Sequence, residues 1–502
     1  MERRTRVRFA PSPTGYLHIG GLRTALYNYF FAKKSGGDFI LRIEDTDQSR
    51  FVPEAEDYIR KSFEWCGIEF DESPWNGGLH APYRQSERKP MYKQYAMQLL
   101  ENGSAYYAFD TSEELDTMRA NLEAQGNPAP QYNYITRQYM KNSLTLPHDE
   151  VQRLLASNTP YVIRIKMPRN EEIKCFDLIR GWVIVNTAQM DDKVLMKSDG
   201  MPTYHLANVV DDYTMLISHV IRAEEWLPSL PLHVFLYQCF GWVDTMPQFA
   251  HLPVVLRPDG NGKLSKRDGD TLGFPVFPLA YSTELSNSNG FKEMGFTRDA
   301  FVNMLAFLGW NPGTPQEIFS FDELIQAFSL ERIGKSGARF DFEKAKWFNQ
   351  QHLAKADAIT LLPQLKAILA SNNCVAEDNK ILTVWNFVND RCIFINDFWR
   401  EGHYFFVERE TIDEAIIVSK SNETTKLALT NIIQSCKQNN TMLAVDFEKI
   451  VKDEMTLRGL KPGDIFPLIR VLLSGEKQGP PMFEMMQLLG HTCSLNRLSA
   501  LA

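Results

Sequence analysis

The sequence predicts an α/β protein: a Rossmann-like parallel sheet with an α+β insertion and an all-helical C-terminal half. Three observations support this fold class. Short apolar runs at residues 7–10, 38–43 and 217–222 have the character of buried strands. Residues 99–199 change to short helices and strands joined by polar linkers, and helical patterns prevail after Asp268.

The length predicts several domains, because 502 residues exceed what one hydrophobic core usually supports. We expect the first half of the sheet domain at 1–98, the insertion at 99–199, the second half of the sheet domain at 200–275, a helical domain at 276–355 and a second helical domain at 356–502.

Composition and charge exclude several classes of protein. With 44% hydrophobic and 23% charged residues, the chain is neither disordered nor fibrous, and no apolar run is long enough to span a bilayer. The seven cysteines are scattered, and the N-terminus lacks the apolar core of a secretion signal, so we expect a cytoplasmic location. A net charge of −8 argues against a protein that coats RNA generally.

The first functional signal is the turn between the strand at 7–10 and a helix expected at 22–34. Pro11 and Pro13 stop the strand, and Gly20 and Gly21 lie at the start of the helix. Free backbone N–H groups and the helix dipole favour an anion at such a place, and His18 adds a side-chain donor. The alternative is an ordinary strand-to-helix turn of any doubly wound domain.

Residues 18–21 (HIGG) resemble the first signature of class I aminoacyl-tRNA synthetases, in which a histidine usually stands at the place of Gly21. That glycine, together with residues 8–15 (RFAPSPTG), 42–47 (RIEDTD) and 83–88 (YRQSER), is similar to the bacterial glutamyl-tRNA synthetase family. The resemblance covers nearly the whole chain.

A second motif lies at residues 263–267 (KLSKR), after the glycine-containing stretch 259–262. Three cations and a serine on such a loop suit a lid over a triphosphate, whereas an isolated basic run is usually a solvated surface. The motif resembles the Lys-Met-Ser-Lys-Ser loop of the family and differs from it at Leu264 and Arg267.

Charged residues follow two of the expected strands. Glu44, Asp45 and Asp47 follow the strand at 38–43, and Arg222 ends the strand at 217–222. Ligands of open α/β sheets bind at the carboxyl ends of strands, so these groups are expected to face one crevice. The acids could instead cap a helix, and Arg222 could pair with a protein carboxylate to offset its desolvation.

The resemblance implies two-step, ATP-dependent joining of L-glutamate to tRNA(Glu), with ATP as substrate and Mg²⁺ as its companion ion. Catalytic roles then fall to His18 and Lys266. The residues implied in ATP binding are His18, Gly20, Gly21, Trp226, Lys263, Ser265, Lys266 and Arg267. Those implied in glutamate binding are Arg8, Ala10, Ser12, Glu44, Tyr204, Asn208 and Arg222.

The resemblance also assigns roles to the outer regions. The insertion corresponds to the region that packs against the acceptor end of tRNA, but residues 105–109 (AYYAF) lack the Cys-x-Cys pair that holds zinc in some members. We therefore expect no structural zinc. The helical domains correspond to stem-contact and anticodon-binding regions, and Arg391 matches an anticodon-reading arginine. An ion pair with Asp390 or Asp397 is the alternative for Arg391.

Other functions are weighed against this one. A related enzyme that glutamylates a modified tRNA base would lack the helical half, and a dinucleotide-dependent oxidoreductase would show G-x-G-x-x-G. A non-catalytic RNA-binding protein would not need both phosphate motifs. Charging of both tRNA(Glu) and tRNA(Gln) stays open. We expect a monomer that does not bind membranes.

Overall fold

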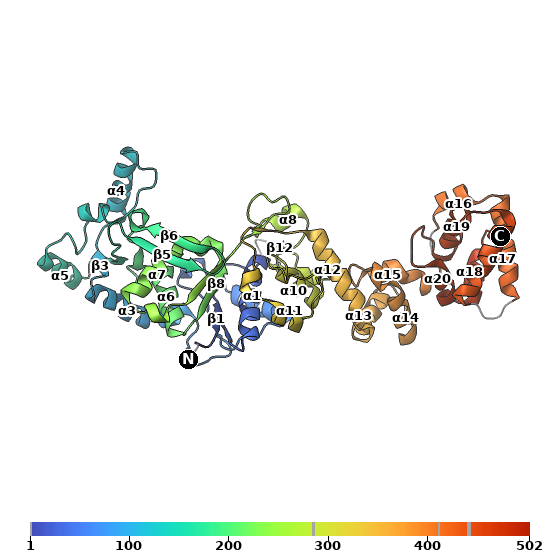
Figure 1. The fold of residues 1–502 in the computed structure, drawn as a ribbon, viewed down its shortest axis with the longest axis horizontal. Coiled ribbons are helices and arrows are strands. Elements are labelled where there is room, and N and C mark those ends of the chain that lie inside the picture. The colour runs from blue at the N-terminus through green and yellow to red at the C-terminus, as the bar shows by residue number, and fades with distance from the viewer. Residues whose placement is uncertain (1–2, 284–286, 410–411, 439–442, 502) are drawn as a thin grey trace. The chain divides into compact units, whose positions relative to one another are not determined.

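The computed structural model describes residues 3–283, 287–409, 412–438 and 443–501 (Figure 1). The chain forms two compact units. The first comprises Met1–Met294 and Phe301–Phe342, and the second comprises Gly295–Ala300 and Glu343–Ala502. Each unit buries a hydrophobic cluster of its own.

Parallel strands form the centre of the first unit, as the apolar runs predicted. Asp177 and Phe249 pair with each other and so join two of these strands. The Ser218 amide donates to the Arg6 carbonyl at 2.8 Å and joins two others. These central strands are β1 (Arg6–Phe9), β2 (Asp38–Leu41), β5 (Glu172–Asp177), β8 (His219–Ala223) and β9 (Gln248–Leu252). Side by side, they run in the order β2, β1, β8, β9, β5.

Helix α1 (Ile19–Lys34) follows β1 directly and packs beside it in Figure 1. It begins three residues before the predicted start at Leu22, because the His18 side chain caps it by accepting from the Gly20 amide at 3.0 Å. Its predicted apolar face is buried. The other helices around the parallel strands are α2 (Ala55–Cys66), α3 (Lys89–Glu101), α6 (Tyr204–Thr214) and α7 (Leu230–Cys239).

The predicted insertion contains an antiparallel sheet in the strand order β3, β4, β7, and β6 pairs with β5 as a hairpin. The elements of this region are β3 (Ala105–Ala108), α4 (Ser112–Ala124), α5 (His148–Ala156), β4 (Val162–Ile165), β6 (Gly181–Asn186) and β7 (Val194–Met196).

Short elements complete this part of the chain. Helix α10 (Arg298–Ala306) ends before Gly309, whose φ of +105° is incompatible with a helix. The other elements are β10 (Val255–Leu256), α8 (Asp268–Leu272), β11 (Tyr281–Ser282), β12 (Asn287–Ser288), α9 (Phe291–Met294), α11 (Phe321–Ala327) and β13 (Ala338–Arg339).

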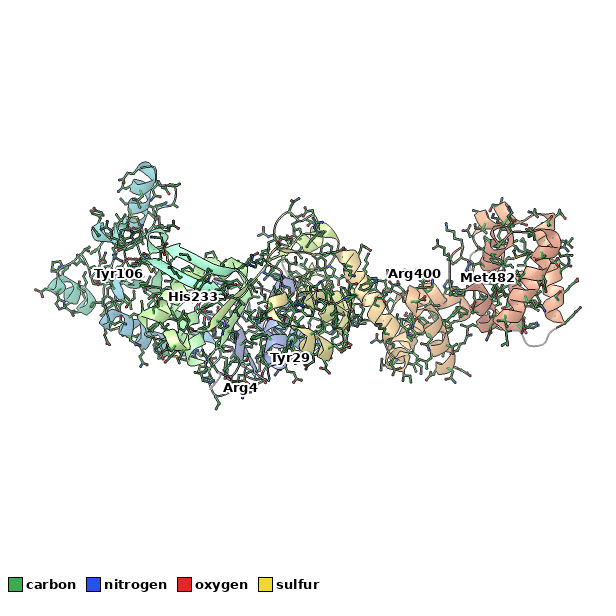
Figure 2. The ribbon with its side chains drawn as sticks, viewed as in Figure 1. Arg4, Tyr29, Tyr106, His233, Arg400 and Met482 are labelled. Atoms are coloured by element: carbon green, nitrogen blue, oxygen red, sulfur yellow. The ribbon has the colours of Figure 1, made fainter. Side chains whose placement is uncertain are left out.

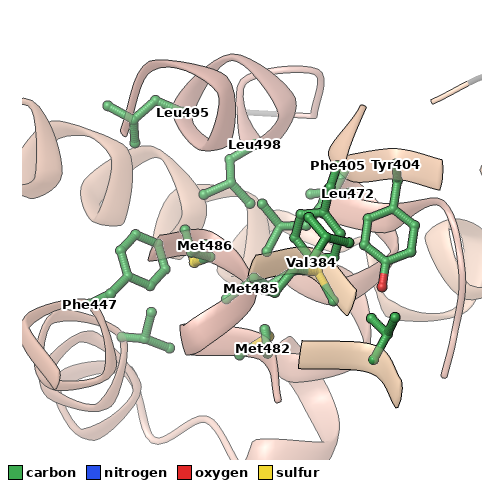
Figure 3. Packing of buried hydrophobic residues seen from close by; sticks show 14 of the residues in the cluster. Val384, Tyr404, Phe405, Phe447, Leu472, Met482, Met485, Met486, Leu495 and Leu498 are labelled. Carbon is green, nitrogen blue, oxygen red and sulfur yellow. The ribbon is translucent and has the colours of Figure 1, made fainter. Parts of the chain in front are cut away.

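The second unit is helical throughout the residues that the structure describes there. Its core joins Phe447, Met485, Met486 and Leu498, which pack together in Figure 3. The helices are α12 (Phe342–Lys355), α13 (Ala358–Ser371), α14 (Asp378–Val388), α15 (Asp397–Gly402), α16 (Glu414–Lys420), α17 (Glu423–Lys437), α18 (Ala444–Arg458), α19 (Pro462–Ser474), α20 (Met482–Leu489) and α21 (His491–Leu498).

The predicted fold class is therefore confirmed: a parallel sheet core, an α+β insertion and a helical C-terminal half. Among the described residues, no helix combines the length and the apolar character needed to cross a bilayer.

Candidate active site

A cavity of about 430 Å³ opens in the first unit where β1 and β8 end and α1 begins. It collects most of the predicted site residues. Those that line it are Arg8, Ala10, Ser12, His18, Gly20, Gly21, Glu44, Tyr204, Asn208, Arg222, Trp226, Lys263 and Lys266. Segments as distant in sequence as residues 8–24 and 254–266 thus meet at one cavity, as expected for the carboxyl ends of parallel strands.

His18 is held as a neutral donor at the start of α1. Its Nδ1 accepts from the Gly20 amide at 3.0 Å, so the neutral ring carries its proton on Nε2. Burial lowers the pKa of His18 to about 4, and the charges of Lys266, Lys263 and Arg23 act in the same direction. The ring is therefore uncharged near pH 7 and offers Nε2–H for a hydrogen bond.

The glycines of the turn lie close to neighbouring side chains. A Cβ atom on Gly20 would lie 2.7 Å from Cε1 of His18, and one on Gly21 would lie 2.7 Å from Cδ1 of Leu17. A larger residue at either position would therefore make the side chain of His18 or Leu17 shift.

The basic loop brings two of its lysines to the cavity. Lys263 forms an ion pair with Glu225, whereas the ion pairs of this loop among the described residues do not include Lys266. The Nζ of Lys266 approaches Gly15, and partial desolvation lowers the pKa of its ammonium group. Lys266 is thus a cation available to an anionic ligand.

Ser265 and Arg267, the other two residues of this loop expected to bind ATP, do not line the cavity. The Ser265 backbone amide and hydroxyl both donate to Oδ2 of Asp268, at 2.6 and 2.8 Å, so this serine is held by the first residue of the short helix α8. Arg267 is exposed at the start of the same helix. Their roles in binding ATP stay predictions.

Beneath the cavity lies a buried network of charges that the sequence did not reveal. Asp212 of α6 accepts from Arg8 Nε and Nη2, at 2.9 and 3.1 Å, and from Arg42 Nη1 at 2.8 Å. Although burial acts in the opposite direction, Arg8 and Arg42 hold the pKa of Asp212 below its usual value. The second amino group of Arg42 donates to Glu44 at 3.0 Å.

This network changes the interpretation of Arg8, which was expected to be open to a substrate carboxylate. Two of its nitrogens already bind a protein carboxylate, which leaves Nη1 of Arg8 for a ligand in the cavity. Residues 42–47 were singled out as a family motif, but no local pattern indicated that Arg42 and Asp212 pair. The partner of an internal arginine depends on the tertiary fold.

Arg222 has a different environment. Its partners among the described residues are neutral: the Tyr204 hydroxyl at 2.7 Å, Nε2 of His251 at 2.9 Å, the Trp226 carbonyl at 3.3 Å and Nδ1 of His233 at 3.5 Å. No described carboxylate forms an ion pair with this buried guanidinium. The alternative of a structural ion pair is therefore wrong for the described residues, and the positive charge remains available in the cavity.

Aromatic rings cover this side of the cavity. Tyr204 and Trp226 pack with ring centroids 4.3 Å apart, and the ring centroid of His233, a residue labelled in Figure 2, lies 5.5 Å from that of Tyr204. Burial keeps the pKa of His233 well below its ordinary value, so this imidazole is neutral. The two histidines that contact Arg222 were not anticipated, because the sequence gives no sign that α7 and β9 meet there.

Arg391 lies in the second unit, in a 3₁₀ helix at Asn389–Arg391. Arg391 does form an ion pair, but its partner is Glu401 and not Asp390 or Asp397. Arg391 Nε donates to Oε2 of Glu401 at 2.7 Å, whereas Asp397 accepts from the amides of Ile393 and Phe394 and pairs with Arg400, a residue labelled in Figure 2. Because Asp397 caps a turn and pairs with Arg400, it is not the partner of Arg391. The role of Arg391 in binding RNA stays a prediction.

The cavity therefore combines two kinds of chemistry. His18, Lys266 and the amides at the start of α1 form an environment for a phosphate chain. Arg222 and Glu44 supply opposite charges for a small molecule that itself carries both signs.

Comparisons with known proteins agree with this geometry. The family model described as "tRNA synthetases class I (E and Q), catalytic domain" matches residues 4–347, and the model "Anticodon binding domain" matches residues 349–502.

Similar proteins and structures span the whole chain. A glutamate--tRNA ligase of Cytophaga hutchinsonii is 51% identical over 99% of this chain and 97% of its own, and one of Amoebophilus asiaticus is 50% identical over 99% and 98%. A crystal structure of a glutamate tRNA ligase from Elizabethkingia meningosepticum in complex with its amino acid superimposes with a TM-score of 0.90 at 47% identity, covering 99% of both chains. The chain belongs to the class I (E and Q) tRNA synthetase family, with its catalytic domain followed by an anticodon-binding domain.

Proposed function

We propose that this enzyme joins L-glutamate to tRNA(Glu) at the expense of ATP, through glutamyl adenylate. The observation that carries the proposal is the buried guanidinium of Arg222, which forms no ion pair with a described carboxylate, in the same cavity as the phosphate-type site at His18 and Lys266. Relatives named glutamate--tRNA ligase at about 50% identity over the full chain support the same substrate.

In the first step, an oxygen of the α-carboxylate of glutamate bonds to the α-phosphorus of ATP, and the bond to the β-phosphate breaks to release pyrophosphate. Catalysis of such transfers is mainly positioning and stabilisation of charge. His18 would donate its Nε2–H to a phosphate oxygen, and Lys266 would neutralise negative charge on the leaving pyrophosphate. Trp226, Lys263, Gly20 and Gly21 complete the proposed ATP site.

In the second step, a hydroxyl of the terminal ribose of the tRNA attacks the carbonyl carbon of the adenylate. The ester bond forms, AMP leaves, and the hydroxyl proton passes to solvent. During both steps, the glutamyl group would bind on the side of the cavity that contains Arg222 and Glu44.

The ammonium group of glutamate has suitable acceptors there. Glu44 is buried and shares Oε1 with Arg42 and with Nδ2 of Asn208, at 3.0 Å each. Oδ1 of Asn208 is buried and has no hydrogen-bond partner among the described residues, so it can accept from the ammonium group. Tyr204, Ala10 and Ser12 line the remaining space.

Mg²⁺ would enter with the phosphates of ATP and offset their charge. Among the described residues, no group of three or more His, Cys, Asp or Glu side chains could hold a metal ion, so we assign Mg²⁺ no protein ligand. The phosphates themselves supply the oxygen ligands that Mg²⁺ prefers.

Glutamate-dependent ATP–pyrophosphate exchange tests the first step, and charging of individually purified tRNAs tests the second. We expect exchange with glutamate, measured with tRNA present, and esterification of the ribose of tRNA(Glu). Glutamate attached instead to a tRNA base would favour the base-modifying alternative, and equal charging of tRNA(Gln) would favour a non-discriminating enzyme. A chain that shows neither activity would contradict the proposal.

We predict that Arg391→Gln relaxes the choice between tRNA(Glu) and tRNA(Gln). A guanidinium presents a planar fork that can read an unstacked base, and the loss of such a contact typically costs about 1–3 kcal/mol of discrimination. Arg391 remains partly exposed beside Glu401, so its other nitrogens can reach RNA. The ratio of the two charging efficiencies, in wild type and variant, measures the effect.

A matched control for Arg391 is Arg400→Gln, because Arg400 pairs with the same Glu401 and is more exposed. The control should keep the wild-type ratio, and neither variant should change the KM for ATP or glutamate. An unaltered ratio in Arg391→Gln would exclude this arginine from anticodon reading.

We predict further that the purified protein carries no stoichiometric structural zinc. The segment that would supply a Cys-x-Cys pair forms β3 (Ala105–Ala108), whose side chains are tyrosine and alanine. Zinc sites of this kind depend on thiolate ligands. Elemental analysis of protein prepared without chelator checks this, and one tightly bound zinc per chain would contradict it.

A cytoplasmic location, a monomeric state and the division of the chain into the five ranges expected from the sequence also belong to this proposal.

A further inference from the structure

Three residues on neighbouring parallel strands form a chain of contacts behind the cavity. Arg222 of β8 lies opposite His251 of β9 in the strand register, and Asp177 ends the next strand, β5. Asp177 and His251 are both fully buried, and Arg222 is 5% exposed. The sheet thus places one charged or titratable side chain at the end of each of three adjacent strands.

Asp177 fixes the orientation of His251. Its Oδ2 accepts from Nδ1 of the imidazole at 2.6 Å and from the His251 backbone amide at 3.1 Å. Its Oδ1 accepts from the amides of Ile179 and Arg180, at 3.0 and 2.8 Å, so the carboxylate cannot rotate freely. The imidazole must then carry its proton on Nδ1 and present the lone pair of Nε2 to Nε of Arg222, 2.9 Å away.

The choice of partner matters for the charge of the arginine. Arg8, in the same cavity, is held by the carboxylate of Asp212, which offsets much of its charge. For Arg222 the corresponding partner is a neutral ring, because burial lowers the pKa of His251 despite the opposing effect of Asp177. A neutral acceptor satisfies the Nε–H group and orients the guanidinium, yet leaves its positive charge for the substrate.

We propose that His251, oriented by Asp177, is a positioning residue that aims Arg222 at a carboxylate of the amino-acid substrate without neutralising it. The inference rests on the proposed function, since it assigns the amino acid to the Arg222 side of the cavity. It predicts that changes at His251 act on the binding of glutamate and not on that of ATP.

Two substitutions of similar size separate this role from a merely structural one. In His251→Asn the amide falls near the place of Nδ1 and can still meet Asp177, but it does not reach Arg222. In His251→Gln the amide extends to the place of Nε2 and can accept from Arg222. We expect His251→Asn to raise the KM for glutamate about tenfold, since a hydrogen bond to a charged group is lost, and His251→Gln to restore much of that loss.

The measurement is steady-state charging of tRNA(Glu) with glutamate and ATP varied in turn, together with thermal unfolding of each variant. The KM for ATP should stay at the wild-type value. His219→Asn is the matched control, because His219 lies at the other end of β8 and contacts the Ser218 hydroxyl instead of the cavity. It should leave the KM for glutamate unchanged.

Unchanged glutamate KM values in both His251 variants would overturn the inference. So would a parallel loss of glutamate and ATP kinetics that follows thermal stability, since that indicates a structural role. A wild-type enzyme without glutamate activity would instead refute the proposed function itself, and this inference with it.

Discussion

Lys266→Ala is expected to slow formation of glutamyl adenylate by roughly 10²-fold or more while the protein stays folded, because a preorganised charge in an active site contributes that much to the transition state. The side chain lies on an exposed loop and lines the cavity near Gly15. Among the ion pairs of this loop in the described residues, none occupies its ammonium group. Pyrophosphate exchange, measured with tRNA present, reports the effect.

Two further variants make the Lys266 experiment specific. Lys266→Arg keeps the positive charge and should retain more activity than the alanine variant. Lys61→Ala removes an exposed lysine of α2 that pairs with Asp57 on the same helix, a contact of little energetic weight. It should exchange pyrophosphate like the wild type. Exchange near the wild-type rate in Lys266→Ala would remove this lysine from the mechanism.

The sequence predicted the parts of the site that depend on local chemistry. Proline, glycine and histidine around residue 18 encode a strand, a turn and a capped helix within a few residues, and the structure has all three. The end of β8 was predicted for a similar reason, because an apolar run that stops at Arg222 indicates a buried strand that ends there.

What the sequence could not predict are the contacts between distant segments. Asp212 of α6 meets Arg8 of β1 and Arg42, which follows β2, only in the folded chain, and no spacing in the sequence encodes that contact. The partner of Arg391 shows the same limit at short range. Asp397 was near in sequence, but it caps a turn, and Glu401 one helical turn later takes the ion pair.

These long-range contacts also decide which arginine is free for a ligand. From the sequence, Arg8 and Arg222 were equivalent candidates for binding a carboxylate. The structure gives Arg8 a bidentate protein partner, whereas the hydrogen-bond partners of Arg222 in the described part of the chain are neutral. The larger share of amino-acid selectivity is therefore expected from Arg222.

Arg222→Gln is expected to raise the KM for glutamate on the order of 100-fold, because the variant removes charged hydrogen bonds to a substrate carboxylate in a buried site. Glutamine carries no charge on its side chain and should lose much less. The preference for glutamate over glutamine, measured as the ratio of the two kcat/KM values, should therefore fall. The KM for ATP should not change, since we propose that the phosphates bind at His18 and Lys266 instead.

The matched control for Arg222 is Arg60→Gln, which removes an exposed arginine paired with Asp57 and Glu64 on α2. Arg222→Lys separates charge from shape: it keeps the cation but loses the planar fork, so its KM for glutamate should fall between those of wild type and Arg222→Gln. Thermal unfolding of all variants excludes loss of the fold as the cause. Unchanged kinetics for both amino acids in Arg222→Gln would return Arg222 to a structural role, and the neutral partners around it would then need another explanation.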